Sequence, residues 1–196
     1  MRKQPRQVRS RATVKAIVSA AARVLGDRGW AGFTTNEVAE VAGVSIGSLY
    51  QYFPDKRSLT EAVRRHHLDD VLLVMRQAGE GTRPIRQRVE GLVDGLIAAH
   101  SVHPQLHRVL LDEAPRHIPP DAAQDELESE YMGRYQALVA ACRRSRDTGD
   151  SELVAQVLSD AVDGVIHNAA CRGALQSPKL KGELVEMVCA YLRVNS

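Results

Sequence analysis

The sequence of 196 residues has few cysteines, only 4% aromatic residues and no long apolar run. Its three cysteines, Cys142, Cys171 and Cys189, are odd in number and widely spaced, which does not fit a disulfide framework. Because no stretch of about 18 apolar residues occurs, no membrane-spanning helix is predicted. The basic first residues are not followed by the apolar segment of a signal peptide, so we expect a cytoplasmic protein.

Motifs for catalysis and for a resident cofactor are also missing from the sequence. It contains no G-x-S-x-G nucleophile motif and no glycine-rich loop that could hold a phosphate. Scattered Ser, His and Asp residues occur in any chain of this length. We therefore predict no catalytic site, no cofactor and no enzymatic activity.

A group of histidines, His100, His103 and His107, is the pattern closest to a metal site. The spacing of His103 and His107 would place both on one face of a helix, as zinc ligands often are. Pro104 suits the first turn of that helix, and a third ligand at a fixed spacing is missing. We therefore predict ordinary surface or lining histidines and no metal.

Charge is distributed unevenly along the chain. Residues 1–58 contain ten Lys or Arg and four acidic residues, a formal charge of +6, and the remaining 138 residues carry −4. This distribution is typical of a nucleic-acid-binding segment joined to a body that has another role.

Helical periodicity extends through the sequence, without strand-like alternation or internal repeats. The pattern predicts an all-α protein. A three-helix N-terminal domain is expected over residues 1–54 and a larger helical domain over 55–196, without a Gly/Ser-rich linker between them. Helices are expected near residues 11–28, 34–42, 45–53, 55–79, 84–97, 104–111, 121–147, 153–166 and 180–192.

Two short helices that meet at a tight turn are encoded between Thr34 and Lys56. Thr34 and Glu37 have the spacing of a capping box, which begins the first helix. Gly43 follows the apolar face of that helix, where a left-handed C-cap is expected, and Ser45 can cap the second helix. This arrangement predicts a helix-turn-helix unit whose second helix enters the major groove of DNA.

The exposed side of the second helix carries groups that suit base edges. A serine such as Ser45 or Ser48 can bond phosphates or bases, Gln51 can bond adenine, and Ile46 can contact a thymine methyl. Gly47 leaves room for close approach. Tyr50, Tyr52 and Lys56 suit the flanking phosphates.

The run AGVSIGSLYQYFPDKRSL, preceded by TTNEVAEV and a basic helix, resembles the signature of TetR/AcrR-type transcriptional repressors. The resemblance covers roughly the first third of the chain. Ile46 departs from it, since many members carry a polar or basic residue there. The resemblance and the helix surface together give the candidate DNA contacts Thr34, Thr35, Ser45, Ile46, Gly47, Ser48, Tyr50, Gln51, Tyr52 and Lys56.

The resemblance also implies partners. It implies a homodimer that pairs through its last two helices and binds palindromic double-stranded operator DNA, and the wide apolar surface of residues 153–166 independently favours a partner. It further implies a small-molecule effector in the larger domain. Candidate ligand contacts put a soft or polar group on an otherwise apolar helix: Met75, His100, Tyr131, Tyr135, His167 and Asn168.

Two other functions fit the same fold. A redox or metal sensor would use Cys142, Cys171 or the histidine group, and its DNA binding would respond to peroxide or a chelator. An architectural DNA-binding protein would have no effector, would bend DNA and would bind it with little sequence preference.

Overall fold

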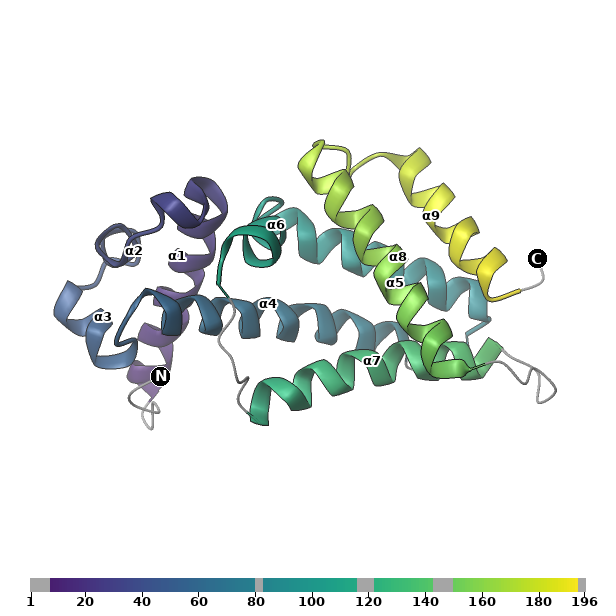
Figure 1. Cartoon of the computed structure of the whole chain (residues 1–196), viewed down its shortest axis with the longest axis horizontal. Coiled ribbons are helices and arrows are strands. Elements are labelled where there is room, and N and C mark those ends of the chain that lie inside the picture. Colours follow the sequence, from purple (N-terminus) through teal and green to yellow (C-terminus); the bar gives the residue numbers. More distant parts are fainter. Residues whose placement is uncertain (1–7, 80–82, 116–121, 143–149, 194–196) are drawn as a thin grey trace. The chain divides into compact units, whose positions relative to one another are not determined.

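The computed structural model describes residues 8–79, 83–115, 122–142 and 150–193. Within these ranges the regular elements are helices, and no strand occurs (Figure 1). This confirms the all-α prediction. The chain divides into two compact units: unit 1 takes residues 1–67 and 103–120, and unit 2 takes 68–102 and 121–196.

Unit 1 contains α1 (Val8–Gly32), α2 (Thr35–Val41), α3 (Ile46–Tyr52), the first part of α4 (Lys56–Gly79), α6 (Leu106–Arg108) and the π-helix η1 (Val109–Glu113). Its core joins one face of α1 to α2 and α3 through large apolar side chains, among them Ile17, Leu25, Phe33, Leu49 and Phe53, each at most 1% exposed. Burial of these side chains fixes the two short helices, which are too short to be stable alone.

Gly29 interrupts α1 at the position where the sequence pattern predicts the end of that helix. Its backbone is left-handed, with φ 67°, and one further turn follows it. The next backbone amide, Trp30 N, donates to the Glu113 carboxylate over 3.0 Å. A Cβ on Gly29 would lie 2.8 Å from that carboxylate, so both the backbone angle and the close approach require glycine.

The segment after α5 belongs with unit 1, although it follows residue 102 in sequence. Leu106, Val109 and Leu110 join the core of unit 1, and the Arg64 guanidinium donates to the Leu110 carbonyl over 2.8 Å. The compact units therefore divide the chain differently from the predicted domains 1–54 and 55–196, since burial of α6 and η1 assigns them to unit 1.

Unit 2 contains the rest of α4 together with α5 (Ile85–Val102), α7 (Ala122–Cys142), α8 (Ser151–Cys171) and α9 (Pro178–Tyr191). Helix α8 packs against α7, α5 and α9, and α5 also packs against α9 (Figure 1). The core of unit 2 includes Leu96, Tyr135, Leu158, Ile166 and Val188. Part of the predicted helix over 121–147 is α7, and residues 143–149 lie outside the described residues.

A glycine allows α4 and α5 to approach closely within unit 2. A Cβ built on Gly95 would lie 2.0 Å from Cγ1 of Val74, a separation that atoms do not tolerate. By contrast, a Cβ on Gly91, one turn earlier in α5, would meet nothing within 4 Å. No described helix has the length and apolarity needed to cross a membrane.

Candidate nucleic-acid interface and ligand pocket

The helix-turn-helix begins each of its two helices with the predicted cap. The Thr34 side chain accepts from Glu37 N over 3.2 Å, and the Ser45 side chain accepts from Ser48 N over 3.1 Å. Between the two helices, Gly43 has φ 66°, the left-handed angle expected of a glycine C-cap. Local hydrogen bonds thus fix where α3 begins.

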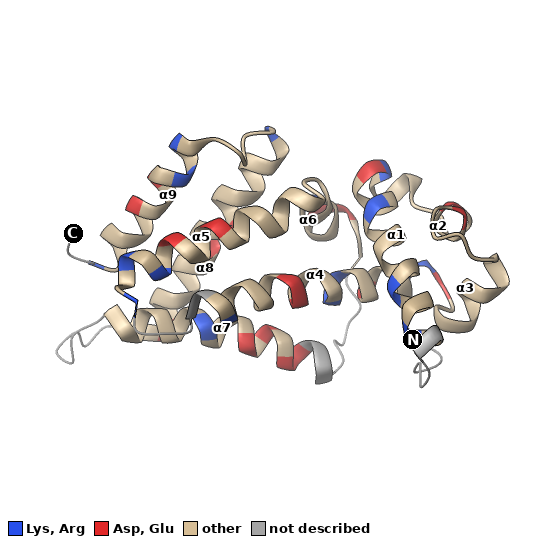
Figure 2. Ribbon diagram, turned by 180° about the vertical axis from the view of Figure 1, so that it is seen from behind, with Lys and Arg blue, Asp and Glu red and all other residues tan. Residues whose placement is uncertain are grey.

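The outer face of α3 is exposed and carries no formal charge. Ile46 is 37% exposed and Tyr50 42%, and Gly47 and Gln51 are exposed with them. Figure 2 shows α3 without a single Lys, Arg, Asp or Glu, whereas α1 carries basic residues. Any positive charge that meets phosphate must therefore come from the elements beside α3.

Polar side chains on this surface bond to one another. The hydroxyls of Thr35 and Tyr50 lie 3.0 Å apart and link α2 to α3, and those of Ser45 and Ser48 lie 2.8 Å apart. Such exposed bonds cost little to exchange for bonds to another polar surface, because water competes for them already.

Two of the candidate phosphate contacts also bond to residues of α1. The Tyr52 hydroxyl lies 2.9 Å from the Ser10 hydroxyl on α1. The Lys56 ammonium donates to the Trp30 carbonyl over 2.6 Å and lies 3.8 Å from the centre of the Trp30 ring. Burial lowers the pKa of Lys56. The sequence did not predict the link to Trp30, because the two residues are far apart along the chain.

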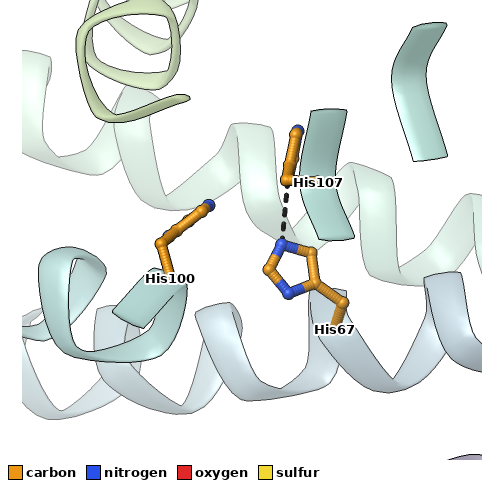
Figure 3. Close-up of side chains that lie close together, drawn as sticks. All are labelled: His67, His100 and His107. Atoms are coloured by element: carbon orange, nitrogen blue, oxygen red, sulfur yellow. Dashed lines mark hydrogen bonds between the residues drawn. The ribbon is translucent and has the colours of Figure 1, made fainter. Parts of the chain in front are cut away.

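His107 contacts a histidine of another helix. His107 Nδ1 lies 2.9 Å from His67 Nε2, a residue of α4 40 positions earlier, and the two rings meet edge to face (Figure 3). No sequence spacing indicated this pair, since it forms only when α6 packs in unit 1.

In unit 2, two of the predicted ligand residues contact each other. His100 is buried and its Nδ1 donates to the Leu96 carbonyl over 2.8 Å, which leaves His100 Nε2 3.3 Å from His167 Nε2. Burial lowers the pKa of His100. Burial and the neighbouring His100 lower the pKa of His167 to about 4, so this ring is neutral at pH 7.

The two predicted tyrosines lie together on α7. Their rings meet edge to face with centres 5.3 Å apart, and the Tyr131 hydroxyl donates to the Asp163 carboxylate of α8 over 2.7 Å. Burial raises the pKa of Asp163 to about 6 and also raises the pKa of both tyrosines. Asp163 was missing from the predicted site, since its contact with Tyr131 depends on how α7 and α8 pack.

A pocket of about 80 Å³ opens in unit 2. Two of the predicted ligand residues, Met75 and Tyr135, line it. Its complete lining is Met75, Arg88, Leu92, Arg134, Tyr135, Ala137 and Leu138. Asn168 is exposed and donates to the Gly164 carbonyl of its own helix over 2.7 Å, so its side chain does not face this pocket.

Two arginines of the pocket, Arg88 and Arg134, were missed by the sequence reasoning. Arg134 bonds the Glu130 carboxylate over 2.9 Å, and Arg76 bonds the same carboxylate over 2.5 Å. Bonds from these two guanidinium groups lower the pKa of Glu130 to about 2. A charged residue on an amphipathic helix is usually solvent-facing, which is why the pattern gave no signal.

The cysteines have differing surroundings. Cys142 is half-buried, Cys171 is exposed and Cys189 is buried. Burial raises the pKa of the thiols of Cys142 and Cys189, which lowers their thiolate fraction and therefore their reactivity. This chemistry does not favour Cys142 as a redox sensor, whereas Cys171, the other cysteine of that alternative, is exposed.

Taken together, capped α2 and α3, an exposed uncharged recognition surface and a separate helical unit with a pocket define a helix-turn-helix regulator. The family model described as "Bacterial regulatory proteins, tetR family" matches residues 17–63. The family model described as "Tetracyclin repressor-like, C-terminal domain" matches residues 84–192. The chain belongs to the TetR family of bacterial transcriptional regulators.

Similar regulators come from several bacteria. The transcriptional regulator BetI of Rhizobium meliloti is 30% identical over 190 residues, which cover 92% of this chain and 90% of BetI. The transcriptional activator FasR of Mycolicibacterium smegmatis is 32% identical over 114 residues, 58% of this chain and 52% of FasR, so the matched part spans about half of that protein.

Solved structures show the same fold. The regulator FadR from Bacillus subtilis, in complex with stearoyl-CoA, aligns with a TM-score of 0.71 at 16% identity, over 91% of this chain and 96% of FadR. At this identity the likeness concerns the fold alone.

Proposed function

We propose that the protein is a repressor that binds palindromic operator DNA as a homodimer through α3 and is released by a small molecule bound in unit 2. The exposed, doubly capped α3 carries the proposal, because its hydrogen-bonding groups are presented on a rigid element without charges that would repel phosphate. A reporter gene placed behind the operator tests the sign: expression should rise when the protein is deleted, and a fall would indicate an activator.

Base discrimination is assigned to the exposed face of α3. Ser45, Ile46, Ser48 and Gln51 offer two hydroxyls, an apolar side chain and an amide, which together suit the edges of bases. The close approach is possible because Gly47 has no Cβ, and only the Ser45 hydroxyl, 4.0 Å away, lies near where one would be.

Selection of bound sequences from a random DNA pool tests this assignment. The enriched sites should be palindromes whose half-sites are about 34 Å apart, one helical turn. Gln51→Ala should relax the preference at one base pair per half-site by about 1–3 kcal/mol. The exposed Gln87 on α5 provides the control, and Gln87→Ala should leave the selected sequence unchanged. An unchanged preference in Gln51→Ala would remove this residue from the interface.

Phosphate contacts are assigned to Thr34, Thr35, Tyr50, Tyr52 and Lys56. The Lys56 ammonium has three donors, and its bond to the Trp30 carbonyl uses one and fixes the position of the others. Lys56→Ala should weaken binding to all DNA sequences and reduce the slope of log affinity against log salt by about 1. Lys179→Ala, at an exposed position in unit 2, is the matched control. A slope unchanged by Lys56→Ala would contradict the assignment.

Self-association is assigned to α8 and α9. These helices expose large apolar side chains one turn apart, Leu153 and Val157 on α8 and Met187 and Tyr191 on α9, each between 37% and 59% exposed. Paired apolar faces of this kind support a four-helix interface between two copies. The symmetric dimer would present two copies of α3 to a palindrome.

Solution mass tests the interface. Val157→Arg should convert the dimer into a monomer and reduce operator affinity, because burial of an unpaired charge opposes association. Leu73→Glu replaces a side chain of α4 that is 52% exposed and should leave the mass unchanged. A Val157→Arg protein that remains dimeric would place the interface elsewhere.

Release by a small molecule is supported by the pocket in unit 2 and by the stearoyl-CoA complex of the similar FadR. Residues of one helix, α4, belong to both units, which offers a direct route for a conformational change. A tenfold loss of operator affinity requires only about 1.4 kcal/mol of preferential ligand binding to the released state. Substrates of proteins encoded beside the operator, added to labelled operator complexes, should include one that releases the DNA.

A further inference from the structure

Two residues that line the pocket of unit 2 each carry a buried polar atom that the described residues leave unsatisfied. Arg88 Nε and the Tyr135 hydroxyl are buried, and neither has a hydrogen-bond partner among the described residues. Both residues line the same pocket. A buried donor without an acceptor costs free energy, and an acceptor supplied by a ligand would recover it.

The charges around the pocket indicate the sign of that ligand. Arg88 and Arg134 both line it, and Glu130 is the carboxylate that bonds Arg134. Glu130 is already shared with Arg76, so one carboxylate serves two guanidinium groups. Arg88 forms no ion pair with a described residue. The Asp163 carboxylate acts on the Tyr135 hydroxyl, so the excess of positive charge lies on the side of Arg88 and Arg134. On that side the charge favours an anion over a neutral or cationic ligand.

The remaining walls are apolar. Met75, Leu92 and Leu138 are at most 6% exposed and contribute a thioether and two isobutyl groups. A volume of about 80 Å³ is roughly half that of a cavity that holds benzene, so it takes about three or four heavy atoms. This is the size of a carboxylate group with the first carbon attached to it, which has four heavy atoms, and slightly less than a phosphate group alone, which has five.

We propose that this pocket binds the anionic end of an amphipathic carboxylate or phosphate ester. Arg88 Nε and the Tyr135 hydroxyl donate to its oxygens, Arg134 adds positive charge, and the apolar walls contact the first carbons. The inference rests on the proposed function, because it assigns a chemical class to the effector of that function.

Calorimetric titration of the full-length protein tests the class with probes of equal chain length. Octanoate or octyl phosphate should bind at least tenfold more tightly than 1-octanol or octylamine, and the stronger anion identifies the head group. Arg88→Met should lose at least tenfold in affinity for that anion. Tyr135→Phe, which removes only the hydroxyl, should lose several-fold. Arg83→Met, at an exposed arginine outside the pocket, should bind as the unmodified protein does.

Thermal unfolding without ligand separates binding from structure. Methionine replaces the aliphatic part of arginine and removes the unsatisfied donor, so Arg88→Met should melt at the same temperature as the unmodified protein or higher. A lower melting temperature for Arg88→Met would assign Arg88 a structural role and overturn the proposal. Equal affinity for octanoate and 1-octanol, or undiminished anion binding by Arg88→Met, would overturn it as well.

Operator binding by the same samples distinguishes the two proposals. If the protein binds its selected palindrome but no anion depends on Arg88, the anion site is wrong and the regulator function stands. If octanoate or octyl phosphate binds through Arg88 but no palindrome is selected, the anion site stands and the operator proposal fails.

Discussion

The polar groups of the two candidate sites differ in exposure and in hydrogen bonding. In unit 1, the hydroxyls of Thr35 and Tyr50, and those of Ser45 and Ser48, bond one another on an exposed surface. In unit 2, Arg88 Nε and the Tyr135 hydroxyl are buried without a partner among the described residues. A surface for DNA can be preorganised at little cost because water already solvates it, whereas a buried ligand site holds unsatisfied groups until the ligand arrives.

Titration should show the largest difference between the units, because the groups with strongly shifted pKa values near neutrality lie in unit 2. Burial raises the pKa of Asp163 to about 6, so this carboxyl binds more protons in the folded state and its contribution to stability falls as pH rises from about 4 to 6. The pKa of His167 is lowered to about 4, so its contribution rises from about pH 4 to 6.5. The two effects oppose each other.

Single substitutions should reveal each effect. Asp163→Asn should leave a stability that increases by about 2 kcal/mol from pH 4 to 6.5, since solvent screens the partly exposed His167. His167→Gln should leave a stability that decreases by about 3 kcal/mol from pH 4 to 6. Urea unfolding across this range measures both. Profiles parallel to that of the unmodified protein in both variants would show that neither group is shifted in the fold.

Two glycines of α5 test how tightly unit 2 is packed. Gly95→Ala should destabilise the protein by about 1–3 kcal/mol, because the added methyl would lie on Val74. Gly91→Ala meets nothing within 4 Å and should stabilise it by about 0.5–1 kcal/mol through helix propensity. Denaturant midpoints measure both. Equal effects of the two substitutions would mean that α4 and α5 do not approach closely at Gly95.

Matched helix caps give the smallest effect and separate stability from function. Ser45 caps α3 in unit 1, and Ser177 caps α9 in unit 2 by accepting from Leu180 N. Either serine changed to alanine should cost about 1 kcal/mol of stability. Operator affinity should fall only in Ser45→Ala, since only this cap lies on the proposed DNA-binding surface. If both variants weakened DNA binding equally, the loss would reflect stability alone.

The helix-turn-helix could be predicted in detail because its determinants are local. The Thr34 and Ser45 caps each bond an amide three residues later, and Gly43 adopts the left-handed backbone angle of a single turn. The all-α class likewise followed from periodicity, since each amphipathic helix shows its buried face in its own sequence. The DNA-contact roles of the exposed residues remain predictions.

Other contacts were decided by tertiary structure alone. Lys56 meets Trp30, His107 meets His67, and the pocket brings Met75, Arg88 and Tyr135 together from three helices. Helix periodicity shows which side of a helix is apolar but not which residues of another helix it will face, because that depends on packing between distant segments. The same limit explains why Met75 and Tyr135 were predicted as ligand contacts while Arg88, on a helix between them in sequence, was not.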